Sequence, residues 1–380
     1  MRLLHVFAGP FPTYQGTQAL VGQICRLLDK AGHDVHLLTY AHGAFESLGD
    51  GFTVHRIDDW PRFRSERSGP ALERPVLDAA LSRAARRLFR ELEPDIVHAH
   101  HYEALTAVRL AGLRPLVFHL HALLGPELPQ YLPGYLRKTA ALTGGLADRV
   151  LPRLAERIVV VSEGIRDQLA RSRIDLDCVR LIRPAAEPPD IDPPAKRAIG
   201  RRLRAIYLGN LDSYQGFDAL FDGLRTLDWA TRSTLRVEVV TASDPEPFLL
   251  DVRRTGIEDM VRVVPHGTLE QAWFRLLAAD FVLVPRYSPG GVPIKLVNAL
   301  AVGKPVLVDR RMAGELIHGE EAWIVDMRDP QAVAAALTRL STDEILRLRL
   351  SEGAIAAAKR LHDPKLVTAA LESLYAELVD

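Results

Sequence analysis

Short apolar runs alternate with amphipathic segments along the chain, a pattern typical of units in which strand, helix and strand follow one another. In the first half the pattern predicts strands over residues 2–8, 34–40, 52–57, 95–100, 115–121, 157–162 and 178–182. Several runs are apolar at almost every position, as parallel strands covered on both faces should be. A helix is expected over residues 17–31, because Leu20, Ile24 and Leu27 share one face and Gly32 can end it.

The alternation is interrupted over residues 184–201, which hold five prolines and show no apolar period, as is typical of a linker. It then restarts, with strands expected over residues 203–208, 235–241, 261–265, 281–285, 305–308 and 322–325, and two or three helices from about residue 330 to 380.

The sequence therefore predicts an α/β protein with two Rossmann-like domains, residues 1–183 and 202–362, joined by the linker 184–201. A C-terminal helix over 363–380 is expected to pack back on the first domain. Such a pair of domains binds a ligand in the cleft where the carboxyl ends of the strands face each other.

Composition excludes several classes of protein. Lys and Arg number 48, as do Asp and Glu, and a net charge of zero argues against a dedicated nucleic-acid binder. The two cysteines, Cys25 and Cys178, make a disulfide framework and a cysteine-rich metal site unexpected, and a reducing, cytoplasmic location fits them. The apolar start is short and broken by His5 and Pro10, unlike a signal peptide, and no run of about 20 apolar residues predicts a membrane span.

The most informative segment covers residues 280–308. A strand is expected to end at Pro285, a loop with Gly290 and Gly291 follows, and a helix begins near Pro293 and ends at Gly303. A glycine loop that opens a helix presents free backbone N–H groups and the positive end of the helix dipole to an anion. An ordinary strand-to-helix turn has the same spacing, so the pattern alone leaves both interpretations open.

Further motifs accompany this segment in a fixed order. They are Gly-Thr-Gln at 16–18, Gly-His-Asp-Val at 32–35, Pro-Asp-Ile-Val-His-Ala-His at 94–100, a histidine at 121, Val-Val-Val-Ser-Glu at 159–163, Ile-Arg-Pro-Ala at 182–185, Tyr-Leu-Gly-Asn-Leu at 207–211, Gln-Gly-Phe-Asp at 215–218, His-Gly-Thr at 266–268 and Gly-Lys-Pro-Val at 303–306. Over nearly the whole chain, the sequence resembles the retaining family-4 glycosyltransferases of the GT-B fold.

The resemblance implies transfer of a glycosyl group from a nucleotide-diphosphate sugar, a UDP- or GDP-sugar, to an acceptor with retention of anomeric configuration. It implies neither a metal ion nor another cofactor. It places His121 against the transferred sugar, and the loop that carries Tyr14 and Gly16 against the acceptor or the donor phosphate.

The chain also departs from that family. The family carries two glutamates eight positions apart, one near the transferred sugar and one on the ribose; here Gly290 and Asn298 take these places. Gly290 offers only backbone to the donor, whereas the amide of Asn298 can still hydrogen-bond ribose hydroxyls. The family's Arg and Lys that hold the diphosphate correspond to Asn210 and Gln215.

Two cations are candidates to replace the missing charges. Lys295 is expected in the first turn of the helix after the glycine loop, and Arg286 leaves the strand just before it. Both can reach a diphosphate that binds there together with Gly291. A solvated lysine and a surface arginine are the alternatives.

Histidines cluster at the ends of two predicted strands: His98, His100, His101, His119 and His121. A metal site is one interpretation, because imidazole is a common ligand. Histidines at alternate positions on two strands need not converge, however, and no cysteine or carboxylate set completes a shell. We therefore expect no metal, and we expect His100 and His119 to be packed and hydrogen-bonded.

Two further features are open. Glu127, in an expected loop, can hold acceptor hydroxyls or be solvated. Residues 61–90 hold eight arginines against three acids, and a helix from about residue 75 places Arg83, Arg86, Arg87 and Arg90 on one face. A solvated face is favoured over a lipid-binding one, so at most peripheral membrane contact is expected.

The expected partners are a nucleotide-sugar donor and an acceptor that is a sugar, a lipid-linked molecule or another small molecule, without nucleic acid. Two alternatives stay open. One is a nucleotide-sugar epimerase of the GT-B fold, which needs no acceptor. The other is a non-catalytic member that binds a nucleotide-sugar or a partner enzyme, and the missing glutamate and Arg/Lys pair motivate it.

Overall fold

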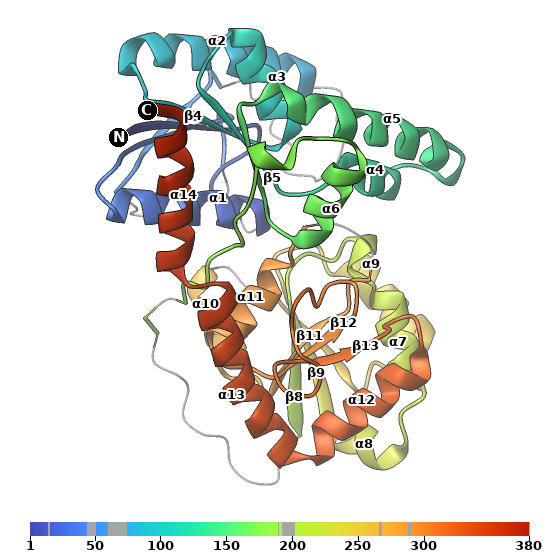
Figure 1. Ribbon diagram of the computed structural model, residues 1–380. Coiled ribbons are helices and arrows are strands. Elements are labelled where there is room, and N and C mark those ends of the chain that lie inside the picture. The colour runs from blue at the N-terminus through green and yellow to red at the C-terminus, as the bar shows by residue number, and fades with distance from the viewer. Residues whose placement is uncertain are drawn as a thin grey trace. The chain divides into compact units, whose positions relative to one another are not determined.

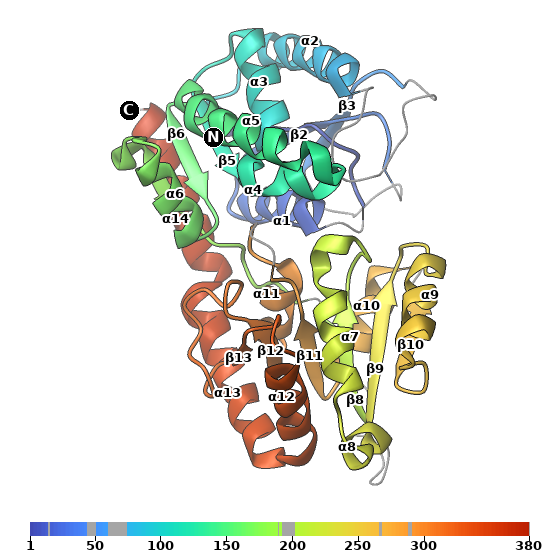
Figure 2. The same cartoon turned by 90° about the vertical axis from the view of Figure 1, so that its right-hand side faces the viewer.

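The computed structural model describes residues 1–13, 16–43, 51–59, 74–188, 190–191, 202–265, 268–287 and 291–379. The chain forms two compact units. The first comprises Met1–Pro184, Gly290–Val292 and Pro364–Asp380, and the second comprises Ala185–Pro289 and Pro293–Asp363. Each unit is a parallel sheet between helices (Figures 1 and 2). Most of the predicted linker, residues 189 and 192–201, lies outside the described ranges.

The first unit contains a seven-stranded parallel sheet of order β3-β2-β1-β4-β5-β6-β7. Its strands are β1 (Arg2–Phe7), β2 (Asp34–Thr39), β3 (Thr53–Arg56), β4 (Ile96–His100), β5 (Leu116–Leu120), β6 (Arg157–Val160) and β7 (Val179–Leu181).

The helices of this unit are α1 (Gly16–Lys30), α2 (Arg74–Leu92), α3 (His101–Ala111), α4 (Leu124–Glu127), α5 (Arg137–Val150), α6 (Glu163–Arg171) and α14 (Pro364–Val379). Short 3₁₀ turns cover Leu128–Tyr131, Gly134–Leu136, Leu151–Leu154 and Leu176–Cys178. α1 packs beside α14 on one face of the sheet, and α2 packs beside α3 on the other (Figure 1).

The second unit contains a six-stranded parallel sheet of order β10-β9-β8-β11-β12-β13. Its strands are β8 (Leu203–Leu208), β9 (Leu235–Thr241), β10 (Val261–Pro265), β11 (Phe281–Val284), β12 (Val306–Asp309) and β13 (Trp323–Val325). Its helices are α7 (Phe217–Arg225), α8 (Trp229–Thr234), α9 (Glu246–Thr255), α10 (Leu269–Leu277), α11 (Ile294–Ala301), α12 (Pro330–Thr342) and α13 (Glu344–Leu361), and a 3₁₀ turn covers Ser213–Gln215.

The two faces of the second sheet bury alternate residues of each strand, because successive side chains of a strand point to opposite faces. Phe281 and Leu283 of β11 pack in a core that α7, α9 and α12 close. Val282 and Val284 pack in a second core, which α10, α11 and α13 close. All four side chains are fully buried, which explains why the strand is apolar at every position.

The predicted α/β architecture is confirmed, and each predicted strand occurs within two residues of its expected ends. The prediction that Glu127 lies in a loop is wrong, because it is the last residue of α4. This four-residue helix depends on a distant group: Asp148 of α5 accepts hydrogen bonds from the backbone N–H groups of Leu124 and Gly125, each at 2.8 Å. Local sequence pattern does not reveal such a contact.

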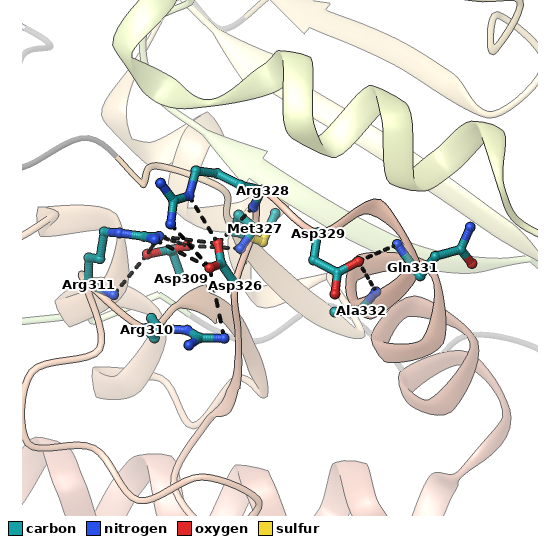
Figure 3. Close-up of polar contacts among 9 residues, drawn as sticks. All are labelled: Asp309, Arg310, Arg311, Asp326, Met327, Arg328, Asp329, Gln331 and Ala332. Atoms are coloured by element: carbon teal, nitrogen blue, oxygen red, sulfur yellow. Dashed lines mark hydrogen bonds and ion pairs between the residues drawn. The ribbon is translucent and has the colours of Figure 1, made fainter.

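A charged network fixes the loops at the carboxyl ends of β12 and β13 (Figure 3). The fully buried carboxylate of Asp309 accepts hydrogen bonds from the backbone N–H groups of Arg311 and Met327, at 2.8 and 2.9 Å. Asp326, just after β13, is hydrogen-bonded by the guanidinium groups of Arg328 and Arg311, which hold the pKa of its carboxyl well below its usual value. Ionic contacts therefore fix these loops together with apolar packing, since Met312, Leu316 and Met327 are buried in the two cores.

Across the described ranges, none of the helices has both the length and the apolar content needed to cross a bilayer.

Helix α14 completes the core of the first unit although it lies at the opposite end of the chain. Leu371, Leu374 and Tyr375 are buried, and the Tyr375 hydroxyl is hydrogen-bonded at 2.6 Å to Nδ1 of the fully buried His98 of β4.

We predict that Tyr375→Phe lowers the free energy of unfolding by about 1–3 kcal/mol, because it leaves a buried ring nitrogen of His98 without a partner. Tyr135→Phe is the matched control, since this ring is 82% exposed and should tolerate the change. Urea unfolding of both variants measures the difference. Equal stability of the two variants would contradict the role assigned to this bond.

Candidate functional site

Two loops of the second unit meet at the carboxyl edge of its sheet. β8 and β11 are neighbours, so the loop from β8 to α7 lies beside the loop from β11 to α11. The first loop carries Asn210 and Gln215, and the second carries Arg286 and leads to Lys295 in the first turn of α11. Residues predicted from separate motifs are thus brought to one place.

A chain of hydrogen bonds joins three of the predicted site residues. Lys295 Nζ donates to Gln215 Oε1 at 2.8 Å, and Gln215 Nε2 donates to Asn210 Oδ1 at 2.6 Å. Asn210 Nδ2 then donates to the hydroxyl of Tyr214 at 2.8 Å. Lys295 is therefore not a solvated surface lysine: its ammonium is fixed beside the two amides.

The surroundings of the Lys295 ammonium hold it tightly. Nζ lies 3.8 Å from the centroid of the Tyr207 ring, an arrangement that stabilises a cation. A Cβ on Gly209 would lie 3.0 Å from Nζ, and Gly209 has a φ of +142°, so this position requires glycine. Burial, reinforced by the positive charge of Arg286, lowers the pKa of Lys295 well below its usual value, and Asp212 opposes this shift.

This environment favours an anionic ligand. The hydrogen-bond acceptor of Lys295 is a neutral amide, so an anion beside Nζ would supply the negative charge that this site lacks and would favour the ammonium form against the effect of burial. Arg286 adds a second cation nearby, with its Cζ 5.1 Å from the centroid of the Tyr214 ring. Burial raises the pKa of Asp212, the acid whose charge acts on the ammonium, and so favours its uncharged form.

The sequence analysis missed the two tyrosines of this site, Tyr207 and Tyr214. Tyr207 belongs to the motif at residues 207–211, but the strand pattern alone assigns it to the core, where its ring is fully buried. The ring also faces Lys295, a contact between β8 and α11 that the strand pattern does not predict.

The other predicted donor and acceptor residues lie as follows. Asn298 is half-buried on α11 three residues after Lys295, a spacing that places both on one side of the helix. Gly291 belongs to the first unit and lies against the backbone carbonyl of His121. Tyr14 and Gly290 lie outside the described residues.

In the first unit, Gly16 is the exposed first residue of α1. Glu127 is half-buried at the end of α4, and its Oε1 accepts a hydrogen bond from the Tyr131 hydroxyl at 3.1 Å. Its carboxylate is thus oriented by a neighbour one turn away, and the structure places it in no cluster with Gly16.

Five histidines are buried on one face of the first sheet, none more than 5% exposed: His5, His98, His100, His119 and His121. Strand register explains the clustering. His5 of β1 is opposite His98 of β4, and His100 of β4 is opposite His119 of β5. Residues two apart in a strand share a face, so all five imidazoles converge.

The imidazoles form two lines of ring-nitrogen contacts. In one, Nδ1 of His5 lies 3.0 Å from Nε2 of His100, whose Nδ1 lies 3.1 Å from Nε2 of His121. In the other, Nδ1 of His119 lies 3.3 Å from Nε2 of His98, which also bonds the α14 hydroxyl. A neutral imidazole has one donor and one acceptor and can satisfy such a line, whereas a charged ring has two donors.

Burial lowers the pKa of every one of these five imidazoles, that of His5 to about 3, and contacts among the rings lower several further. The array is therefore uncharged near neutral pH. His100 and His119 are packed and hydrogen-bonded, as the sequence analysis expects.

The expectation that these histidines need not converge is wrong. Two sets of three, His5 with His98 and His100, and His100 with His119 and His121, bring ring nitrogens within 4.8 Å of one another. Most of these nitrogens face another ring nitrogen, and no carboxylate belongs to either set. The absence of a metal ion therefore stays a prediction.

Comparison with known proteins agrees with this architecture. Residues 14–188 match the family described as Glycosyltransferase Family 4, and residues 191–357 match the family described as Glycosyl transferases group 1. The chain belongs to the glycosyltransferases of the GT-B fold.

Relatives of this glycosyltransferase are distant. One is a D-inositol 3-phosphate glycosyltransferase of Streptomyces bingchenggensis, 26% identical over 308 residues that cover 74% of this chain. The chain spans 66% of that relative's length.

Among solved structures, sucrose-phosphate synthase of Thermosynechococcus elongatus shares 16% identity with a TM-score of 0.81, and the match covers 100% of this chain and 99% of the synthase chain. HepE of Anabaena, solved with UDP and glucose, shares 18% with a TM-score of 0.75, covering 99% and 100%. The similarity to these two solved structures shows that the chain has the GT-B fold.

We predict that the buried histidines make stability fall as pH falls from about 7 to about 5. Their folded-state pKa values lie below the usual 6.5 or so, so the unfolded chain binds more protons below that pH. Each histidine that stays neutral in the folded state lowers the free energy of unfolding by about 1.4 kcal/mol for every pH unit below about 6.5.

Guanidinium unfolding across this range measures the effect. Asp78, whose pKa burial raises to about 6, acts in the opposite direction but contributes a single proton. A free energy of unfolding that stays constant between pH 7 and 5 or so would show that the folded array takes up protons.

Proposed function

We propose that this glycosyltransferase moves a glycosyl group from a UDP-sugar to an acceptor, with retention of anomeric configuration and without a metal ion. The observation that carries the proposal is the Lys295 ammonium, hydrogen-bonded to Gln215 and, through it, to Asn210. These amides occupy the positions at which the family resemblance expects the diphosphate-binding Lys and Arg. A lysine from the first turn of α11 thus supplies charge beside the position that lacks the family's cation.

A nucleotide diphosphate brings at least two negative charges, which are costly to bury without compensation. Three groups in the second unit can compensate this negative charge. Lys295 and Arg286 are cations, and the first turn of α11 presents free backbone N–H groups whose dipole is equivalent to about half a positive charge. Anions bind readily at such a helix start.

Catalysis in this proposal needs no protein base. As the bond between sugar and diphosphate breaks, negative charge grows on the leaving phosphate, and Lys295 and the helix amides stabilise it. The same phosphate accepts the proton of the incoming acceptor hydroxyl, which attacks the face that the leaving group vacates, so configuration is retained.

The remaining predicted residues have roles in binding. Asn298 holds the ribose hydroxyls through its amide, and the backbone of Gly290 and Gly291 faces the donor. His121 contacts the transferred sugar as a neutral imidazole. Tyr14, Gly16 and Glu127 form the acceptor side, and no further cofactor takes part.

The UDP-sugar is proposed because HepE was solved with UDP and glucose. The Streptomyces relative is named for transfer to a phosphorylated inositol, which makes a polyhydroxylated acceptor a reasonable class to test. A sugar, a lipid-linked molecule or another small molecule falls in this class.

Incubation of the purified chain with UDP-, GDP-, ADP- and dTDP-sugars tests the proposal. Release of UDP, with a product whose anomeric proton coupling matches that of the donor, is expected. Conversion of the nucleotide-sugar without release of UDP would identify an epimerase instead. Binding without turnover over all acceptors would identify a non-catalytic member, which the glycine at position 290 favours.

We predict that Lys295→Met weakens binding of UDP about 10- to 150-fold, because one charge-assisted hydrogen bond contributes roughly 1.5–3 kcal/mol. Binding of uridine should change little, because the nucleoside carries no phosphate. Calorimetric titration with both ligands measures the difference.

Lys304→Met is the matched control. Lys304 is also a half-buried lysine of the second unit, but its Nζ donates to the backbone carbonyls of Leu277 and Ala279. Its loss should leave UDP affinity unchanged. An equal loss of affinity for uridine and UDP in Lys295→Met would remove Lys295 from the phosphate site and make Arg286 the next candidate.

A further inference from the structure

Helix α5 of the first unit carries a line of exposed apolar side chains. Leu142, Leu146 and Val150 are 75%, 62% and 51% exposed. They are spaced four residues apart, so they form one stripe along the helix. Exposed leucines occur singly on many proteins, but three in line on one helix form a continuous apolar surface.

The opposite side of α5 fixes the direction of this stripe. Ala140, Gly144 and Asp148, also four residues apart, are buried. A Cβ on Gly144 would lie 2.6 Å from backbone atoms of Leu124, so α5 and α4 are in close backbone contact. With Asp148 bonded to the start of α4, the helix cannot rotate to bury its stripe. α5 lies at the periphery of the first unit (Figures 1 and 2).

The charged side chains beside the stripe on α5 are positive. Residues 128–155 contain four exposed cations: Lys138 and Arg149, which adjoin the stripe, and Arg137 and Arg153, whose guanidinium groups donate hydrogen bonds to the backbone carbonyls of Leu132 and Ser172. The single acid of this segment, Asp148, is buried and accepts a hydrogen bond from the hydroxyl of Tyr102 at 2.5 Å. The chain as a whole has no net charge, so the basic character of this surface is local.

We propose that the α5 stripe and its cations bind the surface of an anionic lipid bilayer, with the helix lying in the plane of the interface. Apolar side chains on one face enter the boundary between headgroups and acyl chains, and flanking cations attract anionic headgroups. Tyr135, 82% exposed just before α5, adds an amphipathic ring of the kind enriched at this boundary.

The charge distribution favours a bilayer over a second copy of the chain. In a symmetric dimer through α5, the same surface of both copies would meet, so the cations beside the stripe, Lys138 and Arg149, would be brought close to those of the second copy. Anionic lipids neutralise these cations. The further consequence that the acceptor is lipid-linked rests on the proposed function, whereas bilayer binding does not.

Flotation of the full chain with vesicles tests the proposal without measuring activity. Binding is expected to vesicles that contain phosphatidylglycerol, and to be weak with phosphatidylcholine alone or at high salt, which screens the headgroup charge. Leu142→Asp with Leu146→Asp should abolish binding. Lys138→Ala with Arg149→Ala should weaken it about 30-fold, as the loss of two surface cations predicts.

Two matched controls are available on the same unit. Leu110→Asp places the same charge at a leucine of α3 that is 78% exposed. Arg83→Ala with Arg90→Ala removes two exposed cations of α2. Both controls should bind vesicles as the unaltered chain does.

Three results would overturn the proposal: no binding by the unaltered chain, equal loss in the controls, or a dimer in solution that Leu142→Asp dissociates. Thermal unfolding of each variant shows whether it is folded. A chain that binds vesicles but transfers no sugar would support bilayer binding by the α5 stripe and refute the proposed function.

Discussion

The parallel pairing of strands in both sheets governs the rest of this molecule. A parallel sheet needs a crossover between consecutive strands, so helices cover both faces and every carboxyl end opens at one edge. Gln215 and Lys295 are 80 residues apart in sequence, yet their side chains are in contact because β8 and β11 are neighbours in the sheet. The candidate diphosphate site is therefore a product of strand order rather than of any continuous motif.

Burial on both faces of a sheet also determines whether histidine and lysine side chains can carry a charge. In the first unit, burial keeps the imidazoles of His98 and His100 neutral, and each bonds another buried ring, His98 that of His119 and His100 that of His121. In the second unit, Lys295 reaches the edge of the sheet, where an amide and an aromatic ring receive its ammonium. Histidines buried on a face of the sheet therefore stabilise the core, whereas a lysine at the carboxyl edge of a sheet is available to a ligand.

Hydrophobic pattern predicts the strands because those of a doubly covered sheet are apolar at nearly every position, as Phe281–Val284 illustrates. It also predicts that Lys295 opens a helix, since the glycine pair and Pro293 precede it. It does not predict the contact with Gln215, which depends on strand order, or the convergence of the histidines, which depends on register. The α4–α5 segment is missed because α4 depends on Asp148 rather than on its own four residues.

The membership of α14 in the first unit has a consequence for biosynthesis. Tyr375, fully buried against His98, leaves the ribosome after every residue of the second unit. Until then the nascent first unit exposes the face of β4 that α14 will cover, together with its unpaired imidazole nitrogen. The unit that is made first is thus completed only after the second unit has been made, and the chain depends on α14 to withdraw that surface from chaperones and proteases.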